Sequence, residues 1–228
     1  MNELISLLKK STLFCDLSPE TIEAALLPLG RLHEFPKGRF LILPQERMDC
    51  FGFVVSGLIH TIHISIDGEQ RIMEAYETGE ICGADLMCTR SRISPYHMMA
   101  AQPSQVLLFP VSALLEPGSL PEADRQKILM RLLTLIAHEN MRKDYRLAIL
   151  SQKGLRERIM TYLTMQASKR GTSTFTIPFD REELASFLCV NRSALSHELT
   201  VMKQEGIIQC RKSTFTLLHW NDEDGQGY

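Results

Sequence analysis

The sequence lacks the features that mark membrane, secreted and disulfide-stapled proteins. No apolar run approaches the roughly 20 residues of a membrane-spanning helix, so we expect no membrane partner. The N-terminus MNELISLLKK places its lysines after its leucines, the reverse of a secretory signal, which predicts a cytoplasmic protein. The six cysteines form no CxxC pair and no zinc-ribbon spacing, so neither a structural metal nor a disulfide framework is indicated.

A large excess of one charge is also missing, since the formal net charge is −2 over 228 residues. The balance is uneven along the chain: residues 151–220 carry ten Lys or Arg against six Asp or Glu, and the rest is acidic. This surplus permits nucleic-acid binding by the C-terminal part without requiring it. With 44% hydrophobic residues, the chain is long enough for one large or two small domains.

The first half changes from a helical to a strand pattern. Residues 2–29 carry two helical patterns, and Ser18 is the expected N-cap of the second. From Arg31 to Phe109 the hydrophobic period is two, and glycines separate short segments. In HTIHISIDGEQ, alternate residues from His60 to Ile66 share one face, and Asp67-Gly68 follows as a hairpin turn. These patterns predict a small antiparallel barrel or roll.

A long helical pattern begins at Pro121 and has the 4-3 apolar spacing of a coiled-coil seam. We predict that two subunits pair along it, although the spacing also fits a helix packed only on its own barrel. Asn140 and Lys143 interrupt the apolar seam, and a buried Asn can fix the oligomeric state at a cost in stability. The predicted dimerisation residues are Leu129, Leu133, Ile136, Asn140 and Leu147.

The C-terminal part predicts a helix, a short strand, two further helices and a hairpin. The first helix, KGLRERIMTYLTMQASKRG, ends at Gly171, and TFTIPF is the strand. Helices then start at Asp180 and Asn191, and IIQCRKSTFTLL forms two alternating runs around a basic turn. Two helices followed by a hairpin is the order of a winged helix.

The helix beginning at Asn191 has two different faces. Leu195, Leu199 and Met202 recur at helical spacing and predict the buried side. The opposite face presents side chains that all form hydrogen bonds, as contacts to base edges in a DNA major groove require. These candidate base contacts are Arg192, Ser193, Ser196 and His197. An ordinary solvated helix face is the alternative, and the capped helix before it and the basic hairpin after it favour DNA. We predict phosphate contacts by Arg211, Lys212, Lys153 and Arg158, for each of which plain solvation fits as well.

At this point the chain resembles the Crp/Fnr family of transcription factors, named for the cyclic AMP receptor protein and the fumarate-nitrate reduction regulator. The similar segments are FPKGRFLILPQE, GFVVSGLIHTIHISIDGEQRIMEAYETGE and DREELASFLCVNRSALSHELTVMKQEGII. The resemblance implies a homodimer on a palindromic duplex, controlled by a sensory barrel, with RNA polymerase as a partner if the protein is an activator. Two departures are Cys189, where the family usually has Gly, and His197, where it usually has Arg. The family's usual half-site is therefore not transferred.

The resemblance implies an α+β fold with an antiparallel β-roll of the cyclic-nucleotide-binding, cupin-type kind, a long dimerisation helix and a winged helix-turn-helix. We place the effector-sensing roll at residues 1–120, the dimerisation helix at 121–150 and the DNA-binding domain at 151–228. A module of the same fold that has lost specific DNA binding is the alternative. An enzyme with a metal on clustered histidines is not indicated, because His60 and His63 point to opposite faces of a strand.

The effector site departs from that of the cyclic-nucleotide members. In GEICGADLMCTRSRISPYHMMAA, Ala84 stands where those members have a Glu for the ribose, and Ser94-Pro95 replaces the Arg-Ser that binds phosphate. Without these polar contacts we expect no response to cyclic AMP, unless Arg90 or Arg92 supplies the charge in another alignment.

The N-terminal region contains only Cys15, so an iron-sulfur cluster is not expected either. The candidate effector residues are soft and apolar, and simple core packing is the favoured interpretation of them. They are Cys82, Gly83, Met87, Cys88, His97 and Met99, together with Met98 and with Leu133 of the long helix. They suggest a pocket for an apolar small molecule or for haem with His97 as axial ligand, or a redox-sensitive Cys82/Cys88 pair.

Overall fold

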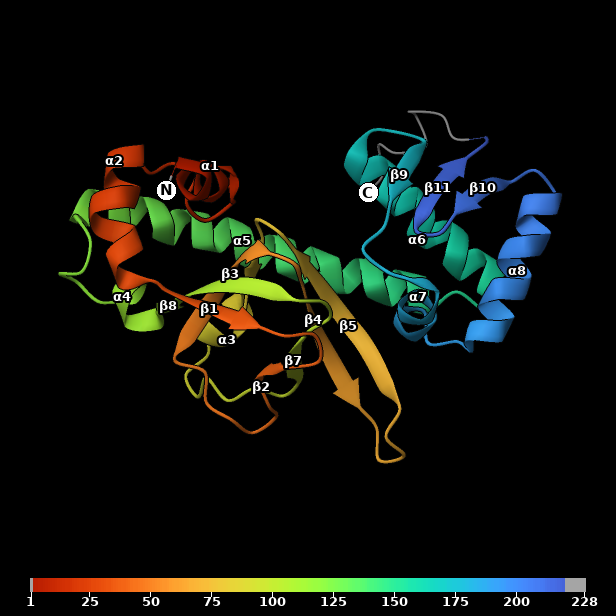
Figure 1. The fold of residues 1–228 in the computed structure, drawn as a ribbon, viewed down its shortest axis with the longest axis horizontal. Coiled ribbons are helices and arrows are strands. Elements are labelled where there is room, and N and C mark those ends of the chain that lie inside the picture. Colours follow the sequence, from red (N-terminus) through yellow and green to blue (C-terminus); the bar gives the residue numbers. More distant parts are fainter. Residues whose placement is uncertain (1, 220–228) are drawn as a thin grey trace. The chain divides into compact units, whose positions relative to one another are not determined.

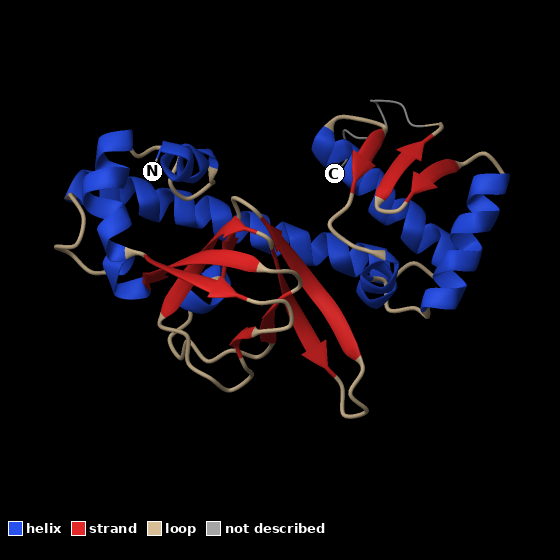
Figure 2. Cartoon of the chain, in the orientation of Figure 1, coloured by secondary structure: helices blue, strands red, loops and turns tan. Residues whose placement is uncertain are grey.

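The structure is a computed structural model that describes residues 2–219. The described residues form two compact units. The first holds the residues up to Gly68 and Met73–Met141, and the second holds Glu69–Ile72 and the residues from Arg142 onward. Figure 1 labels the elements of both, and Figure 2 shows that strands lie in each unit. None of the helices in the described part combines the length and hydropathy that crossing a bilayer requires.

The N-terminal helices form as expected. Helix α1 spans Asn2–Lys10, and α2, Pro19–Thr21, continues through a π-helical stretch, Ile22–Leu26, into a 3₁₀ turn, Leu27–Leu29. Ser18 is the N-cap, since its Oγ accepts a hydrogen bond from the Thr21 backbone N–H at 3.1 Å. The predicted cap is therefore confirmed, and it starts the helix that leads into the first strand.

The β-roll consists of two four-stranded sheets with the orders β1-β8-β3-β6 and β2-β7-β4-β5. The strands of the first sheet are β1 (Arg31–Phe35), β8 (Ser104–Pro110), β3 (Cys50–Ser56) and β6 (Ile81–Cys82). Those of the second are β2 (Phe40–Ile42), β7 (His97–Ala100), β4 (Leu58–Ile64) and β5 (Gln70–Glu77). The pairings described residue by residue are antiparallel, and the short helices α3 (Ala84–Met87) and α4 (Val111–Leu115) follow β6 and β8. The period of two therefore predicted the roll correctly.

Alternation along β3 and β8 gives the first sheet two buried faces. Val54 and Val106 pack with Cys82 and Met98 into one apolar cluster. The opposite face carries Phe51, Phe53, Leu107 and Phe109, which pack with residues of α1, the α2 region and the long helix. A sheet buried on both sides needs close approach at some positions, and Gly52 provides one. A Cβ there would lie 2.6 Å from Cys82 Sγ.

An aromatic cluster joins the N-terminal segment to this sheet. The ring of Phe109 lies 5.6 Å from that of Phe14 and 5.5 Å from that of Phe51, measured between centroids. All three side chains are fully buried. Such rings contribute both buried area and favourable edge and offset contacts.

The hairpin between β4 and β5 departs from the expected pattern at its tip. The turn is centred on Ile66 and Asp67, one residue earlier than predicted, and Gly68 donates its backbone N–H to the Ser65 carbonyl at 2.9 Å with φ +83°. The expectation that Ile66 shares a face with His60 is wrong. His60 is buried, whereas Ile66 is fully exposed, because the strand ends at Ile64 and the chain has already turned.

The long helix, α5, runs without interruption over Glu122–Leu150, as its sequence pattern predicts. Ile128, Leu132 and Leu135 form its buried side within the first unit. These residues have the predicted 4-3 spacing, but each lies one position before its counterpart in the predicted seam, which is Leu129, Leu133 and Ile136. The predicted seam residues Leu129 and Ile136 are half-buried against the same core.

The second unit is built on helix α6, Leu155–Arg170, which ends at Gly171 in the left-handed region. A three-stranded sheet of order β10-β11-β9 follows, with β9 Thr174–Thr176, β10 Ile208–Arg211 and β11 Thr214–Leu217. Helices α7, Arg181–Phe187, and α8, Arg192–Gln204, lie between β9 and β10 in the chain. The predicted order of helices, strand and hairpin is confirmed.

Replacing Asp180 by Ala is expected to lower the free energy of unfolding by about 1 kcal/mol, because the residue caps α7. Its Oδ1 accepts hydrogen bonds from the Glu182 and Glu183 backbone N–H groups at 2.8 and 2.9 Å. Thermal unfolding monitored by circular dichroism measures the loss. Asn191→Ala is the matched control, since Asn191 is also an N-cap but its side chain makes no capping hydrogen bond. An equal loss in both variants would contradict this account of Asp180.

Candidate nucleic-acid interface

The two helices that carry the candidate interface, α7 and α8, are joined by a tight turn at residues 188–190. The Cys189 N–H donates to the Ser186 carbonyl at 3.2 Å, and the Val190 N–H donates to the Ala185 carbonyl at 3.0 Å. Cys189 adopts φ +55°, a left-handed conformation that favours glycine. Its side chain is exposed. The turn thus keeps the geometry for which the family uses Gly, although a side chain is present.

Helix α8 has one buried side and one exposed side, as predicted. Leu195, Leu199 and Met202 are at most 3% exposed. The candidate base contacts are all exposed, and they are Arg192, Ser193, Ser196 and His197. The buried side fixes the helix to its unit, so these polar side chains are free to meet a ligand.

The hairpin after α8 places two cations at its tip. β10 and β11 pair from Ile208↔Leu217 to Arg211↔Thr214, leaving a two-residue turn of Lys212 and Ser213. Arg211 and Lys212 are exposed. Both are therefore accessible for the predicted phosphate contacts.

The other two candidate phosphate contacts differ from each other. Lys153 is exposed, whereas Arg158 is half-buried. The Arg158 guanidinium donates to the backbone carbonyls of Gln152 at 3.1 Å and Leu188 at 3.3 Å. Arg158 thus connects the segment before α6 to the turn before α8, a role that the sequence does not indicate.

A second arginine of α6, Arg156, was not anticipated. Arg156 donates from Nε to Glu198 at 2.6 Å and from its terminal nitrogens to Glu205 at 2.7 and 3.3 Å. These contacts raise the pKa of Arg156, with the Glu198 hydrogen bond as the main cause. The partners lie 42 and 49 residues away, so no local spacing signals the contact.

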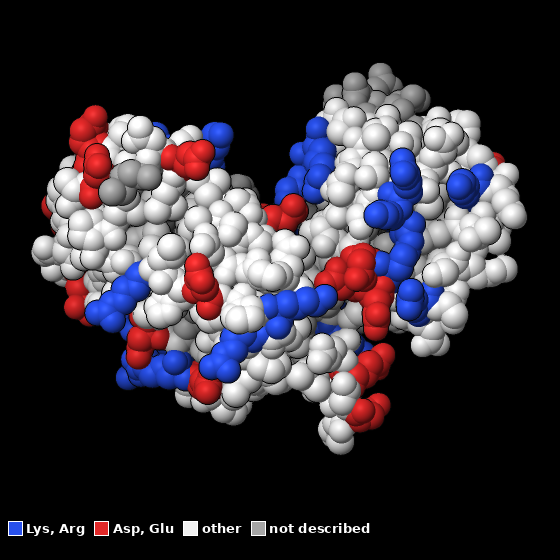
Figure 3. All heavy atoms as spheres, viewed as in Figure 1, with Lys and Arg blue, Asp and Glu red and all other residues white. Residues whose placement is uncertain are grey.

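Surface charge alone does not identify the interface. On the face that Figure 3 presents, Lys and Arg side chains lie beside Asp and Glu in both units, without a broad patch of one sign. The assignment therefore rests on the shape and chemistry of α8 and its neighbours.

The candidate effector residues do not form one group. Cys82 packs in the cluster between the sheets, whereas Met87 packs with the N-terminal helices, and Gly83, which is buried, lies between them in the chain. Met98 is fully buried, Met99 and His97 are half-buried, and Cys88 is exposed. Leu133 is 65% exposed on α5.

His97, Cys82 and Cys88 differ in their surroundings. The His97 ring lies 5.4 Å from the Phe40 ring, and its buried Nδ1 has no hydrogen-bond partner among the residues that the structure describes. Burial raises the pKa of the Cys82 thiol to about 12 and also raises the pKa of Cys88. Because thiolates are the reactive form, the arrangement does not favour a redox pair.

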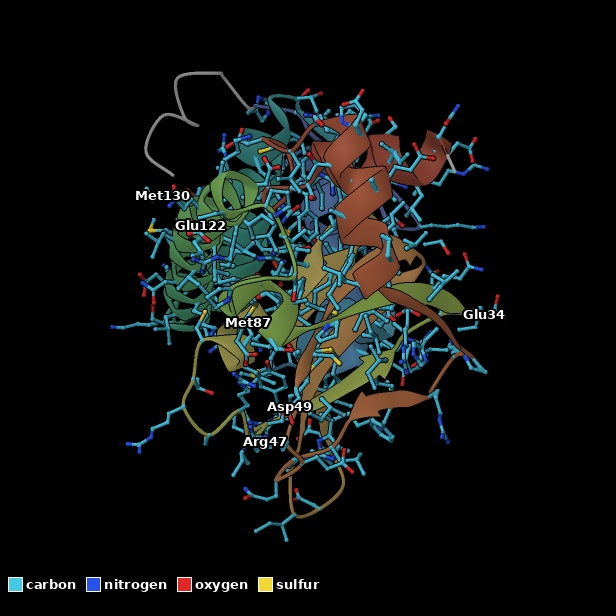
Figure 4. All side chains as sticks on the ribbon, turned by 90° about the vertical axis from the view of Figure 1, so that its left-hand side faces the viewer. Glu34, Arg47, Asp49, Met87, Glu122 and Met130 are labelled. Atoms are coloured by element: carbon cyan, nitrogen blue, oxygen red, sulfur yellow. The ribbon has the colours of Figure 1, made fainter. Side chains whose placement is uncertain are left out.

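The loop around Ser94, predicted from the sequence to replace the family's phosphate-binding segment, is held by hydrogen bonds within the loop and to carboxylates outside it. Ser94 is buried, and its Oγ donates to the Tyr96 carbonyl at 2.6 Å. The Tyr96 hydroxyl donates to Asp85 Oδ1 at 2.7 Å. Arg92 pairs with Asp49 at 3.0 Å, as does Arg47, which Figure 4 labels beside Asp49. Arg92 is thus engaged by a carboxylate, and its contact, followed by that of Arg47, lowers the pKa of Asp49.

Helix α5 exposes apolar side chains on its outer side. Met130 projects outward in Figure 4. The side chains of Met130, Leu133 and Leu147 are 66%, 65% and 66% exposed. Asn140 is exposed as well, and Met141 is 45% exposed. The structure therefore divides the predicted dimerisation set: Leu133, Asn140 and Leu147 are accessible, while Leu129 and Ile136 pack inward.

Among the described residues no group of three His, Cys, Asp or Glu is placed to hold a metal ion.

Comparison with known proteins finds a family match in the N-terminal half of the chain and another in the C-terminal part. A family model described as cyclic nucleotide-binding domain matches residues 32–116, and one described as Crp-like helix-turn-helix domain matches residues 157–222. The transcriptional activator protein Anr of Pseudomonas protegens is 29% identical over 179 residues, covering 75% of this chain and 70% of Anr. The cyclic AMP receptor protein of Thermus thermophilus is 22% identical over 207 residues, covering 91% and 92% of the two chains.

A solved structure shows the same fold. The c-di-GMP responsive regulator CLP of Xanthomonas campestris superposes with a TM-score of 0.71 at 17% identity, over 89% of this chain and all of that one. The roll, the long helix and the winged helix-turn-helix occur in the order that the two family matches require. This chain is therefore a transcriptional regulator of the Crp/Fnr family and not an enzyme.

Proposed function

We propose that the protein binds a palindromic DNA site as a homodimer and that α8 selects its sequence from the major groove. The observation that carries this proposal is that α8 exposes Arg192, Ser193, Ser196 and His197 while Leu195, Leu199 and Met202 of the same helix are buried. A helix of this kind fits the major groove, where base pairs present distinct donor and acceptor patterns.

The chemistry of each side chain suggests its contact. Arg192 has the fork of donors that suits guanine N7 and O6, and the serine hydroxyls suit several base edges or phosphates. His197 is shorter than the family's usual Arg and donates a single hydrogen bond from one ring nitrogen. We therefore expect a half-site that differs from the family's usual one. Lys153, Arg211 and Lys212 would contact phosphates, which hold the protein in position without selecting sequence.

The outer side of α5 supports the homodimer. Isolated exposed apolar residues are common, but Met130, Leu133, Met141 and Leu147 lie on one helix and recur at helical spacing. Pairing this face with a second copy would bury these residues and place Asn140 at the interface. A two-fold dimer then requires a pseudo-palindromic site.

For the roll, we propose an effector other than cyclic AMP. Ala84 is buried where the nucleotide-binding members have a carboxylate, and Ser94 is turned into its own loop. A cytoplasmic location follows from the proposed function. Calorimetric titration with cyclic AMP should give no heat of binding, and saturable binding would refute this part of the proposal.

Selection of random duplexes by the purified protein tests the DNA-binding proposal. We expect enrichment of one palindrome and an affinity that falls steeply with salt, because phosphate contacts release counterions. No enriched sequence, together with a salt slope near zero, would instead support a partner-binding module of the same fold.

Arg192→Ala is expected to cost on the order of 1–3 kcal/mol on the selected duplex and to relax one base position. The loss arises because a bidentate contact to guanine discriminates against the other bases. Fluorescence anisotropy against the selected duplex and its single-base variants measures both effects. Lys153→Ala is the matched control, since loss of a phosphate contact should weaken all duplexes alike. A uniform loss in Arg192→Ala would show that Arg192 contacts only phosphate.

A further inference from the structure

One arginine of α6 holds two carboxylates of the helix proposed to contact bases. Arg156 lies near the start of α6, Glu198 lies in the middle of α8, and Glu205 is the C-cap of α8. The three N···O distances are 2.6, 2.7 and 3.3 Å. Nε and both terminal nitrogens of the guanidinium each donate to one of the two carboxylates. We refer to this group of Arg156, Glu198 and Glu205 as the Arg156 clamp.

The two carboxylates lie on one flank of α8. Seven residues separate them, which is close to two full turns at 3.6 residues per turn, so they project in nearly the same direction. This flank lies between the buried residues and the exposed face that carries His197. An arginine that grips both points therefore resists rotation of α8 about its own axis.

We propose that Arg156 is a positioning residue for DNA recognition, which rests on the proposed function of α8. Side chains that recognise a ligand must be held within about 0.5 Å and 10–20° of their working geometry by neighbours that lock them. The apolar contacts of Leu195, Leu199 and Met202 hold α8 in place but have no direction. The clamp adds hydrogen bonds of fixed direction to these non-directional contacts.

The clamp's expected effect is on recognition rather than on stability. The side chain of Arg156 is 37% exposed, and those of Glu198 and Glu205 are 22% and 44% exposed. Ion pairs with this exposure contribute little to folding, because water and salt screen them. A variant without the clamp should therefore fold, and a change in sequence preference can be separated from a change in stability.

Arg156→Lys tests the proposal because it keeps the charge but replaces the fork by one ammonium group, which reaches one carboxylate at a time. We expect the dissociation constant for the selected duplex to rise about tenfold, comparable to one mismatched base pair. The dissociation constant for random duplex and the melting temperature should stay unchanged. Arg39→Lys makes the same substitution at an exposed position of the β-roll and should leave all three measurements unchanged.

Several outcomes would overturn the proposal. Equal weakening on both duplexes would make Arg156 a phosphate contact, and unchanged discrimination would show that the clamp has no part in recognition. If Arg156→Lys fails to fold, Glu198→Ala decides, since it removes the acceptor of the Arg156 Nε hydrogen bond and should still reduce discrimination between the duplexes. A wild-type protein that enriches no sequence would refute the proposed function itself, whereas a selective wild type with an equally selective Arg156→Lys refutes only the clamp.

Discussion

Replacing Leu133 and Leu147 together by Glu is expected to produce monomers and to weaken binding to the palindromic duplex by roughly 10²–10⁴-fold. That range is what two linked binding modules gain over one when both can engage. Both side chains are about two-thirds exposed in the single chain, so the substitutions should not disturb its own core. In the proposed dimer, four new carboxylates would be buried against each other without partners, which is strongly unfavourable. Sedimentation velocity measures the mass, and anisotropy measures the affinity.

The control for this pair is Ile66→Glu, which places the same charge at a fully exposed apolar position on the hairpin tip of the roll. It should leave both the mass and the affinity unchanged. A double variant that sediments as a dimer would rule out this face of α5 as the interface. A double variant that is monomeric yet binds the palindrome as tightly as the wild type would rule out the link between dimer and affinity.

Phe109→Ala is expected to reduce the free energy of unfolding of the first unit by about 3–5 kcal/mol, the range for removal of a buried aromatic side chain. Phe109 contacts the rings of both Phe14 and Phe51, so a cavity would open between the N-terminal segment and the first sheet. Urea unfolding monitored by circular dichroism measures the loss. Phe40→Ala is the control, because Phe40 is only half-buried and should cost clearly less. A loss below about 1 kcal/mol in Phe109→Ala would mean that the cluster carries little stability.

The fold was largely predictable because its elements carry local signals. The N-caps Ser18 and Asp180, the terminating Gly171 and the change of hydrophobic period each depend on neighbours in the chain. Ile66 was misplaced for a related reason. Apolar and polar residues continue to alternate in the sequence after Ile64, but the strand ends there and the chain turns. Gly68, with its positive φ and its hydrogen bond to the Ser65 carbonyl, is the last residue of that turn.

The candidate site was predictable on α8 and less so elsewhere. Helical spacing separates Leu195 and Leu199 from the exposed face, since both sides of one helix can be derived from one segment. The partners of Arg156 and Arg158 depend on how α6 packs against distant segments, so spacing contains no information about them. Apart from Leu133, the candidate effector residues were grouped because they are close in sequence, whereas the structure places Cys82 and Met98 in one apolar cluster and Met87 in another.

The seam on α5 was shifted for a physical reason as well. An apolar stripe at 4-3 spacing is compatible with two neighbouring sets of positions, and a helix with apolar residues on two sides satisfies both. The structure resolves this by burying Ile128, Leu132 and Leu135 and leaving Leu133 and Leu147 outside.

The two-sidedness of α5 also limits how the chain can change in length. Each residue advances an α-helix by about 100° and 1.5 Å, so an insertion between Leu135 and Leu147 would turn every later side chain by that angle. Leu147 would leave the line that it forms with Leu133 and Asn140 along this helix. Substitutions along this helix are therefore tolerated more easily than insertions or deletions, because only the latter change the direction of every later side chain. Insertions and deletions in this gene should accumulate in loops such as the tip at Ile66 and be absent from the helix.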